Sequence, residues 1–391
     1  MIHRSRALAL RAAACAAAAL AVAGCSQSST SANSSSISVT GHTLDIYLSE
    51  PATIASDTVA QDVVDAERLA FDEHSSEVTD YKLRLRVVRS SQVSQNARDA
   101  IEDNRAIAYL GEIAPGASDD TVGITNALDL LQVSPTDTAL ELGQGTSAVT
   151  SAPQTFFESW GSFGRTFARL VPSSAQEATA QVAEMKSLGV TSLFISDDGS
   201  DYGRSIAQAV RKAAGTAGLT VQSGMSGASG IFYGAQSPSL AAKFFGGASA
   251  VDPNAKLFGP SSLNTTIFTK AVAGSLHNLY VTIPGFMPKQ LNSAGQAFTK
   301  VFAGTYGHQP NVEAIFGYEA MTALLAVLKQ AGSSANDRAT VVRDFLKLSE
   351  SQSVLGPYKI DSNGNTSLDA FVVARFSGGT LQPFRAAPTQ G

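Results

Sequence analysis

Short apolar runs that end in small polar residues recur along the chain, and most of them are followed by a segment with helical spacing. The clearest example is residues 189–221, where the apolar run 191–196 lies between Gly189 and two aspartates. Apolar residues at positions 206, 210, 213 and 217 then recur at helical spacing, and Gly218 can adopt the left-handed conformation that ends a helix. This pattern predicts a strand, a loop, a helix and a returning strand.

The same alternation fills two stretches of the chain. Strands are predicted at 44–48, 82–88, 106–110 and 131–134 in the first stretch, and at 191–196, 230–233, 256–258 and 279–283 in the second. Helices follow at 291–306, 313–330 and 337–348, and hairpin signals close the chain. The predicted fold is therefore α/β, with two Rossmann-like lobes, exchanged segments, a hinge and a ligand cleft between the lobes.

The lobe boundaries follow from breaks in this alternation. Residues 141–154 are rich in glycine, serine and threonine, which indicates a segment that crosses between lobes. We expect residues 42–152 and 285–350 to form an N-terminal lobe, and 153–284 and 351–391 a C-terminal lobe. Trp160 follows the crossing, where packing between lobes is favoured over ligand stacking. Asp57 is predicted to cap a helix, and Ser174 with Glu177 to form a capping box.

The N-terminal residues resemble a bacterial lipoprotein signal peptide. A basic start is followed by an apolar run at 12–23, which is too short to span a bilayer stably, and by the small residues before Cys25. The resemblance implies a signal peptide at 1–24, lipidation of Cys25, a membrane anchor and a flexible tether at 25–41. The alternative is an ordinary signal peptide in which Cys25 is incidental.

Composition excludes several classes of protein. With 44% hydrophobic and 16% charged residues in 391, the chain can bury a large core, and a net charge of −5 without a basic stripe excludes nucleic acid as an expected partner. The two cysteines, Cys15 and Cys25, both lie near the N-terminus. No metalloprotease, serine hydrolase or phosphate-loop motif is present, so neither an enzyme nor a cofactor is predicted. Asp197, Asp198 and Asp201 lack the spacing of a calcium loop and are assigned to turns and caps.

Several phrases resemble type I periplasmic solute-binding proteins, in particular the branched-chain-amino-acid group of ABC-transporter receptors. The resemblance extends from about Leu44 to the end of the chain, and its phrases in order are FARLVP at 167–172, DGSDYG at 198–203, FGP at 258–260, GYEAM at 317–321 and YKIDSNG at 358–364. In that family the ligand lies between two lobes and stabilises a closed form. The resemblance thus implies the type I periplasmic binding protein fold.

Four positions carry the expected site over from the family. Ser118 and Thr138 correspond to hydroxyls that bind a ligand carboxylate, and Tyr202 corresponds to a tyrosine that covers the ligand from the other lobe. Ser261 stands where the amino-acid binders place an acidic residue for the ammonium group.

A zwitterionic amino acid would then need another carboxylate in place of Ser261, and the candidates are Asp137 and Glu112. Gln236 and Ser237 follow a predicted strand, so they are further candidates for polar ligand contacts. Capping remains the alternative role for Ser118 and Thr138, and lobe packing remains the alternative for Tyr202.

These expectations favour a lipid-anchored receptor that captures a small polar solute, amino-acid-like or an amide, and presents it to the membrane subunits of an ABC permease. The alternative is an interaction lipoprotein of the same fold without a solute, such as an activator of a cell-wall synthase.

Overall fold

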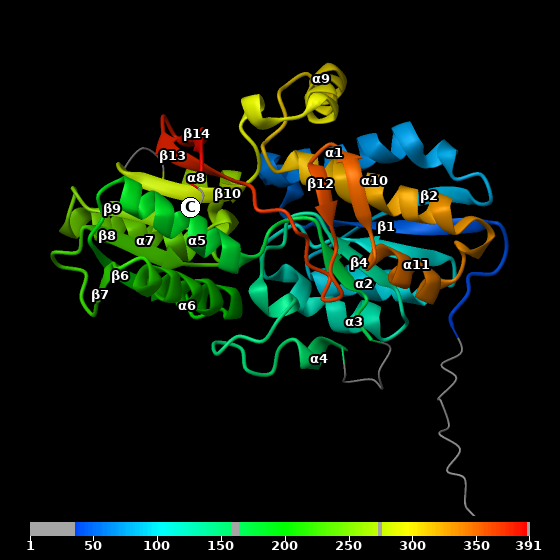
Figure 1. Cartoon of the computed structure of the whole chain (residues 1–391), viewed down its shortest axis with the longest axis horizontal. Coiled ribbons are helices and arrows are strands. Elements are labelled where there is room, and N and C mark those ends of the chain that lie inside the picture. Colours follow the sequence, from blue (N-terminus) through cyan, green and yellow to red (C-terminus); the bar gives the residue numbers. More distant parts are fainter. Residues whose placement is uncertain (1–35, 158–163, 273–275, 389–391) are drawn as a thin grey trace, which may run out of the picture. The chain divides into compact units, whose positions relative to one another are not determined.

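The computed structural model describes residues 36–157, 164–272 and 276–388 (Figure 1). The predicted signal peptide, Cys25, residues 25–35 of the tether, and Trp160 lie outside the described residues.

The first sheet has five strands in the order β2-β1-β3-β4-β5, all parallel. Its strands are β1 (Thr43–Pro51), β2 (Lys82–Ser90), β3 (Ala106–Leu110), β4 (Leu131–Ser134) and β5 (Phe167–Arg169). Its helices are α1 (Thr58–His74), α2 (Val93–Glu102), α3 (Val122–Asn126), α10 (Ala314–Ala331) and α11 (Arg338–Phe345). Successive side chains of β1 face opposite layers: Ile46 packs with α1, α10 and α11, while Tyr47 packs with α2.

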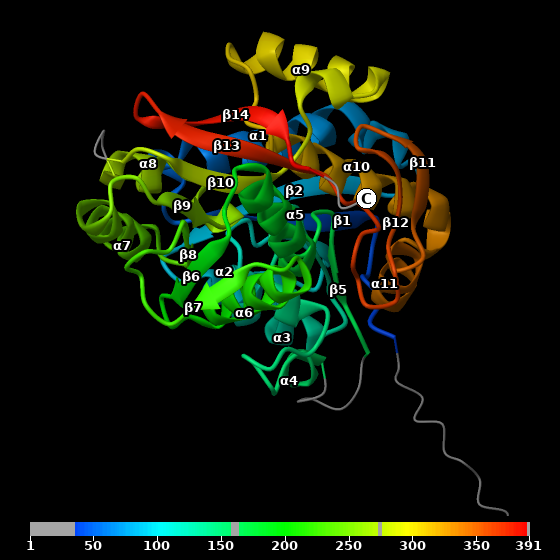
Figure 2. The ribbon, with the colours of Figure 1, turned by 60° about the vertical axis from the view of Figure 1, so that its left-hand side comes forward.

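The second sheet has seven strands in the order β14-β13-β10-β9-β8-β6-β7. Its strands are β6 (Ser192–Asp197), β7 (Thr220–Gln222), β8 (Gly230–Gly234), β9 (Lys256–Gly259), β10 (Leu279–Pro284), β13 (Phe371–Ser377) and β14 (Thr380–Ala386). Strands β6 to β10 pair in parallel, and the hairpin β13–β14 adds antiparallel to β10 (Figure 2). Four helices cover this sheet: α5 (Ser174–Ser187), α6 (Asp201–Thr216), α7 (Pro238–Val251) and α8 (Thr266–Val272).

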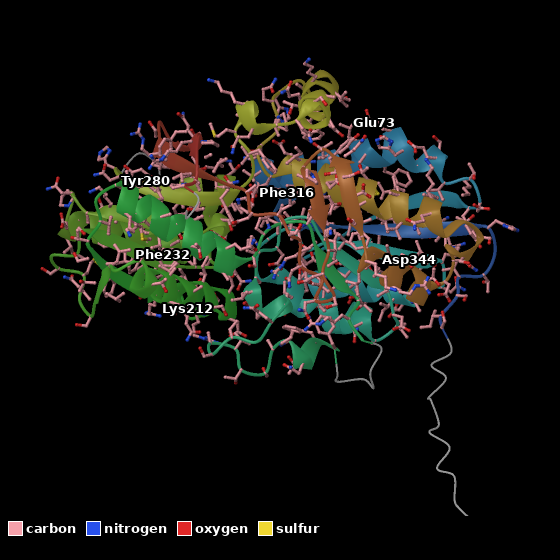
Figure 3. All side chains as sticks on the ribbon, in the orientation of Figure 1. Glu73, Lys212, Phe232, Tyr280, Phe316 and Asp344 are labelled. Atoms are coloured by element: carbon pink, nitrogen blue, oxygen red, sulfur yellow. The ribbon has the colours of Figure 1, made fainter. Side chains whose placement is uncertain are left out.

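Alternation along the strands gives the second sheet two apolar faces. Phe232 of β8 and Tyr280 of β10, both labelled in Figure 3, belong to the core shared with α5 and α6. Their neighbours Tyr233 and Val281 belong to the core shared with α7 and α8. The two-residue period therefore places one helix pair on each face.

The remaining elements connect or flank these layers. They are α4 (Gln154–Phe157), α9 (Ser293–Tyr306), β11 (Ser349–Ser353) and β12 (Gly356–Lys359), with 3₁₀ turns at η1 (Ile54–Ser56), η2 (Ser75–Glu77), η3 (Ala117–Asp120), η4 (Leu140–Leu142), η5 (Ser261–Leu263), η6 (Pro288–Gln290) and η7 (Gly332–Ser334). The predicted α/β class with two lobes and parallel sheets is confirmed. The predicted hairpin with its Gly378-Gly379 turn is also present as β13–β14.

Two lobe boundaries differ from the predicted ones. Strand β5 belongs to the first sheet, although residues from 153 onward were assigned to the C-terminal lobe. Residues of the β11–β12 region, Leu355 and Tyr358 among them, pack in the core of the first sheet, although 351–391 were assigned to the C-terminal lobe. The chain therefore passes between the lobes from β5 to α5, from β10 to α10, and from β12 to β13.

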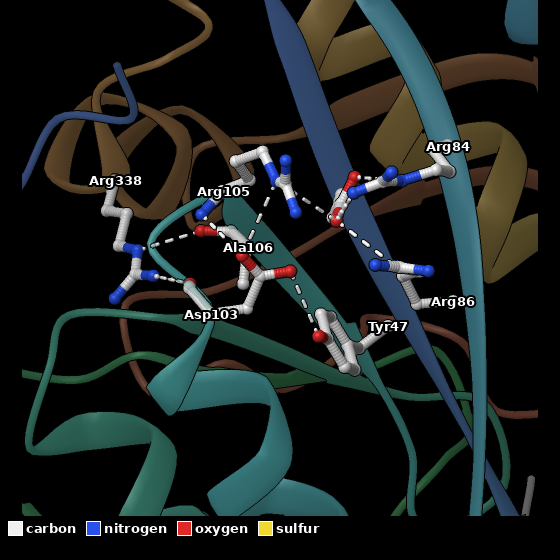
Figure 4. A network of polar contacts seen from close by, with 8 residues as sticks. Tyr47, Arg84, Arg86, Asp103, Arg105, Ala106 and Arg338 are labelled. Atoms are coloured by element: carbon white, nitrogen blue, oxygen red, sulfur yellow. Dashed lines mark hydrogen bonds and ion pairs between the residues drawn. The ribbon is translucent and has the colours of Figure 1, made fainter. Parts of the chain in front are cut away.

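A buried aspartate, Asp45, stabilises the edge of the first sheet at the amino end of β1. Its partners Arg84, Arg86 and Arg105 are labelled in Figure 4. Asp45 is fully buried and paired with Arg84 and Arg86 of the edge strand β2 and with Arg105 before β3. Burial by itself raises the pKa of Asp45, but the hydrogen bonds from the arginines and the charge of Arg84 outweigh it and hold the pKa below its usual value. This network stabilises the sheet at the end away from the strand-end loops.

Candidate ligand-binding site

The loops at the carboxyl ends of strands from both sheets enclose a cavity of about 210 Å³. It is bordered by residues that follow β1, β3 and β4 of the first sheet and β8 and β9 of the second. Its polar lining residues are Thr53, Asp57, Thr136, Gln236, Ser261, Ser262, Asn264, Thr265 and Glu313. Larger hollows of about 420 to 620 Å³ exist elsewhere, but this one lies where open α/β sheets bind ligands.

Asp57 connects the two lobes at one end of the cavity. As predicted it caps α1, since its Oδ1 accepts a hydrogen bond from Val59 N at 3.2 Å. The same oxygen accepts one from Thr266 N, at the start of α8 in the other lobe, at 3.0 Å. Thr58 N in turn donates to Thr266 Oγ1 at 3.1 Å. Burial raises the pKa of Asp57, against the lowering effect of these N–H donors.

Glu313 precedes α10 and is the second carboxylate in the cavity wall. Its Oε2 accepts a hydrogen bond from Asn264 Nδ2 at 2.6 Å, again across the lobes. Its Oε1 has no hydrogen-bond partner within the described residues, although the side chain is only 6% exposed. Burial, followed by the nearby charges of Glu177 and Asp57, raises the pKa of Glu313 to about 8 in spite of the bond from Asn264.

A third carboxylate lies directly behind the cavity. Glu177 of α5 is fully buried, and it accepts hydrogen bonds from Ser261 N at 2.6 Å and from Ser261 Oγ at 2.9 Å. Burial raises its pKa to about 8. The predicted capping box of Ser174 and Glu177 is wrong: the cap is one residue earlier, with the Gln176 side chain accepting from Ser173 N. Glu177 is thereby free to hold the β9 loop.

The predicted site residues fall into two groups, and the first lies at the cavity itself. Ser261 and Gln236 line it. Ser237, the neighbour of Gln236, instead caps α7 by accepting a hydrogen bond from Leu240 N.

The second group is buried beside the cavity rather than in its wall. Thr138 and Tyr202 are fully buried, and Thr138 Oγ1 lies 3.4 Å from both the Tyr202 hydroxyl and Ser261 Oγ. Ser118 is also fully buried, and its Oγ accepts a hydrogen bond from Glu112 N at 3.2 Å. Thr138, Tyr202 and Ser261 therefore contact one another across the lobes.

The carboxylates expected to replace an acidic residue at position 261 are both engaged elsewhere. Asp137 accepts hydrogen bonds from the backbone N–H groups of Gly116, Ser118 and Ala139 at 2.7, 2.9 and 3.0 Å. Glu112 accepts from Ser49 Oγ at 2.8 Å and from the Tyr109 hydroxyl. Neither residue is among those that line the cavity.

Sequence reasoning missed the roles of Asp57, Asn264 and Glu313 in the cavity wall. Asp57 was recognised only as a helix cap, and Glu313 only as the start of a helix. In the sequence, these residues appear only as polar residues near a helix N-terminus and a strand-end loop. Many ordinary helix caps show the same pattern, so it does not identify a binding site. Their convergence depends on how the two lobes meet.

Within the described ranges, no group of three His, Cys, Asp or Glu side chains is arranged to hold a metal ion. None of the helices in that part of the chain combines the length and apolar character needed to cross a bilayer.

Comparisons with known proteins agree with this architecture. Residues 221–380 match the model of the family described as periplasmic binding protein. A search of curated protein sequences finds no match.

Solved structures share the fold over most of the chain at low sequence identity. A leucine-binding protein of Thermotoga maritima has 17% identity and a TM-score of 0.71, covering 89% of this chain and 99% of its own. A branched-chain amino acid transporter substrate-binding protein of Streptococcus pneumoniae, in complex with isoleucine, has 14% identity and a TM-score of 0.68, with coverage of 88% and 99%. An ABC-transporter solute-binding protein of R. palustris, in complex with benzoate, has 16% identity and a TM-score of 0.65, with coverage of 89% and 96%. The chain thus has the two-lobed fold of the type I periplasmic binding proteins.

Proposed function

We propose that the chain is an extracytoplasmic receptor of an ABC importer, which captures a small polar solute in the cavity between its lobes and presents it to the membrane subunits of a permease. The observation that carries this proposal is the cavity itself, which is bordered by strand-end loops of both sheets and contains polar side chains from each lobe. The structurally similar proteins are described as a leucine-binding protein, a branched-chain amino acid transporter substrate-binding protein, and a solute-binding protein of an ABC transporter in complex with benzoate.

The proposal includes attachment to the membrane through a lipid on Cys25. Its support is the sequence around that residue: a basic start, an apolar run and small residues directly before the cysteine. A serine- and asparagine-rich stretch follows and is suited to act as a tether.

A thermal-shift screen of the purified protein tests the receptor proposal. Amino acids, amines, amides, urea and aromatic acids form the library. A solute that binds only the folded state at 100 times its Kd stabilises by about 2.7 kcal/mol, which corresponds to a rise in Tm of about 4 °C for a protein of this size. Failure of every compound in a broad library to raise the Tm would contradict solute capture.

One observation favours the alternative of an interaction protein without a solute. The hydroxyls of Thr138, Tyr202 and Ser261 contact one another directly, and apolar residues of both lobes, such as Leu142 and Val182, share one core. Part of the interlobe space is therefore filled by the protein. A library without effect on the Tm would support this alternative.

A further inference from the structure

We infer that the interlobe cavity takes a solute that carries a protonated amine and no carboxylate. This inference rests on the proposed receptor function and specifies the chemical class of its solute. It follows from which hydrogen-bonding groups of the cavity are already used and which are left free.

Four side-chain donors of the cavity wall are engaged with the protein. Ser261 Oγ donates to Glu177, and Ser262 Oγ donates to Ala235 O. Thr136 Oγ1 donates to Ile113 O at 2.6 Å. The amide of Asn264 donates to Glu313. The side-chain donors left are those of Thr53, Gln236 and Thr265, which are all neutral. A carboxylate would therefore be buried there without a cationic partner, which is costly.

The neighbouring backbone N–H groups could bind an anion, but they already bind a carboxylate of the protein. The N–H groups of Gly116, Ser118 and Ala139 surround the fully buried Asp137 carboxylate at 2.7 to 3.0 Å. Ser118, which was expected to bind the carboxylate of an amino acid, thus gives its N–H to an internal carboxylate. A second anion beside Asp137 would be repelled at short range.

The titratable groups of the cavity are both acidic. Asp57 and Glu313 are the titratable residues in the lining, which contains no lysine, arginine or histidine. Glu313 is only 6% exposed, and its Oε1 has no partner within the described residues. This oxygen is accessible at the cavity surface, and an N⁺–H donor from a solute would bind it with a strong charge-assisted bond.

The apolar part of the cavity lining restricts the kind of amine that fits. The rest of the lining consists of aliphatic and proline side chains, among them Val63, Ile113 and Ile267, and includes no aromatic ring. Quaternary ammonium groups are usually held by aromatic faces, which are absent from this lining. The cavity therefore suits an amine with N–H donors and a small apolar body.

A matched set of probes tests the inference by isothermal titration calorimetry on the purified protein. Isobutylamine, 3-methylbutanoate and valine share one apolar body and differ in charge. Alanine and isoamylamine have equal numbers of non-hydrogen atoms and control for size. We expect the two amines to bind and the two amino acids and the carboxylate not to bind.

Two variants assign the effect to Glu313. Glu313→Gln keeps the shape of the side chain and removes its charge, so amine affinity should fall by about 10- to 100-fold, the loss expected for one charge-assisted hydrogen bond. Glu319→Gln is the matched control: Glu319 lies in α10, the helix that Glu313 precedes, is also buried, and does not line this cavity. Amine affinity in Glu319→Gln should equal that of the unmodified protein.

The pH dependence gives an independent readout. The amine favours the ionised carboxylate, so its binding lowers the pKa of Glu313 from about 8 and releases a proton. Affinity should therefore rise as the pH increases from about 6 to about 9, and this rise should disappear in Glu313→Gln.

Each outcome bears on a defined part of the inference. Tighter binding of valine, alanine or 3-methylbutanoate than of the amines would overturn the solute class and leave the receptor function intact. Equal weakening in Glu313→Gln and Glu319→Gln would overturn the role of Glu313. An absence of binding by these probes and by the whole thermal-shift library would refute the receptor function and the inference with it.

Discussion

At the scale of single residues, the two lobes are held together by hydroxyl, amide and carboxylate contacts. Thr138 contacts Tyr202 and Ser261 at 3.4 Å, and the Thr58 and Thr266 hydroxyls are 2.8 Å apart. No ion pair between oppositely charged side chains joins the lobes among the residues that the structure describes. Neutral hydrogen bonds each contribute only about 1 kcal/mol net, so the apolar core that the lobes share, with Leu142 and Val182, also contributes to holding them together.

Two substitutions of Tyr202 distinguish a role in packing from a role in ligand binding. Because its ring is fully buried, Tyr202→Ala should leave a large cavity and cost about 3 to 5 kcal/mol in the free energy of unfolding. Tyr202→Phe removes only a hydroxyl with a long 3.4 Å contact, and should cost less than about 1 kcal/mol. Urea unfolding of both variants measures these values.

The solute affinity of Tyr202→Phe tests whether the Tyr202 hydroxyl contacts the ligand, as the family resemblance implies. Tyr202 does not line the cavity, so the affinity should stay within about twofold of the unmodified protein. A loss of tenfold or more would instead support the role that the family resemblance implies.

Sequence patterns located part of the site at this scale. Ser261 was predicted from the family resemblance, and Gln236 because residues just after buried strands meet at one edge of a sheet. The direction of a side chain within a loop cannot be predicted from such patterns. In the structure, Ser237 caps α7 and Ser118 Oγ is a buried hydrogen-bond acceptor. Glu177 and Glu313 were missed because their partners, Ser261 and Asn264, are distant in sequence.

At the scale of elements, α1 and α10 are the pair that places the cavity carboxylates. Asp57 stands at the N-terminus of α1 and Glu313 at that of α10. The helices approach closely at Gly317, where an added Cβ would lie 2.4 Å from Val63 O. A glycine is required at this position because any side chain would meet the backbone of α1.

Gly317→Ala should therefore force the two helices apart. Overpacking of this kind costs about 1 to 3 kcal/mol in the free energy of unfolding, even though alanine has the higher helix propensity. Gly304→Ala in α9 is the matched control, since no atom lies within 4 Å of its added Cβ. That change should be neutral or stabilise by up to about 1 kcal/mol.

Chemical denaturation of both variants measures the difference. Equal stability of Gly317→Ala and Gly304→Ala would show that α1 and α10 do not pack as closely as described. A lower affinity for solute in Gly317→Ala would add that the spacing of the two helices also matters for the cavity.

Elements with strong periodicity were predictable from the sequence, and weak ones were not. Helix α10 and strand β8 carry apolar residues at the spacing that their burial requires. Strand β5 has three residues, too few for a period to be recognised, and β11 has the polar sequence SESQS. Strand β5 pairs with β4, and β11 pairs with β12, whose Tyr358 packs in the core of the first sheet. These contacts are not encoded in the local sequence, which explains the two misplaced lobe boundaries.

At the scale of the whole molecule, buried acidic residues occur in both lobes. Burial is the largest cause of a raised pKa in each case: to about 7 for Glu112 and Glu141, about 8 for Glu177 and Glu319, and about 9 for Asp119. These carboxyl groups bind protons more tightly in the folded protein than in the unfolded chain.

This distribution predicts that the folded protein loses stability as the pH rises. Between about pH 5 and pH 9 the folded state holds more protons than the unfolded state, so the free energy of unfolding falls with increasing pH. A carboxyl group whose pKa is one unit higher in the folded state than in the unfolded chain contributes at most about 1.4 kcal/mol to this loss. The Tm should therefore be clearly higher at pH 5.5 than at pH 9, as measured by calorimetry in matched buffers.

Glu319→Gln tests the origin of this dependence. Glu319 is 1% exposed and accepts a hydrogen bond from the Tyr358 hydroxyl at 2.8 Å. Its replacement by an uncharged side chain should reduce the loss of Tm between pH 5.5 and pH 9. A Tm that is constant or rises over this range would contradict the raised pKa values.

The close contact at Gly317 also bears on how a solute would leave. Both cavity carboxylates belong to the first lobe, on helices whose backbones touch, whereas Gln236, Ser262 and Asn264 belong to the second. In a receptor of the proposed kind, an opening of the lobes would leave the carboxylates at their mutual spacing and remove the amides and hydroxyls of the second lobe. An amine bound to Asp57 and Glu313 would then stay on the first lobe until it departs.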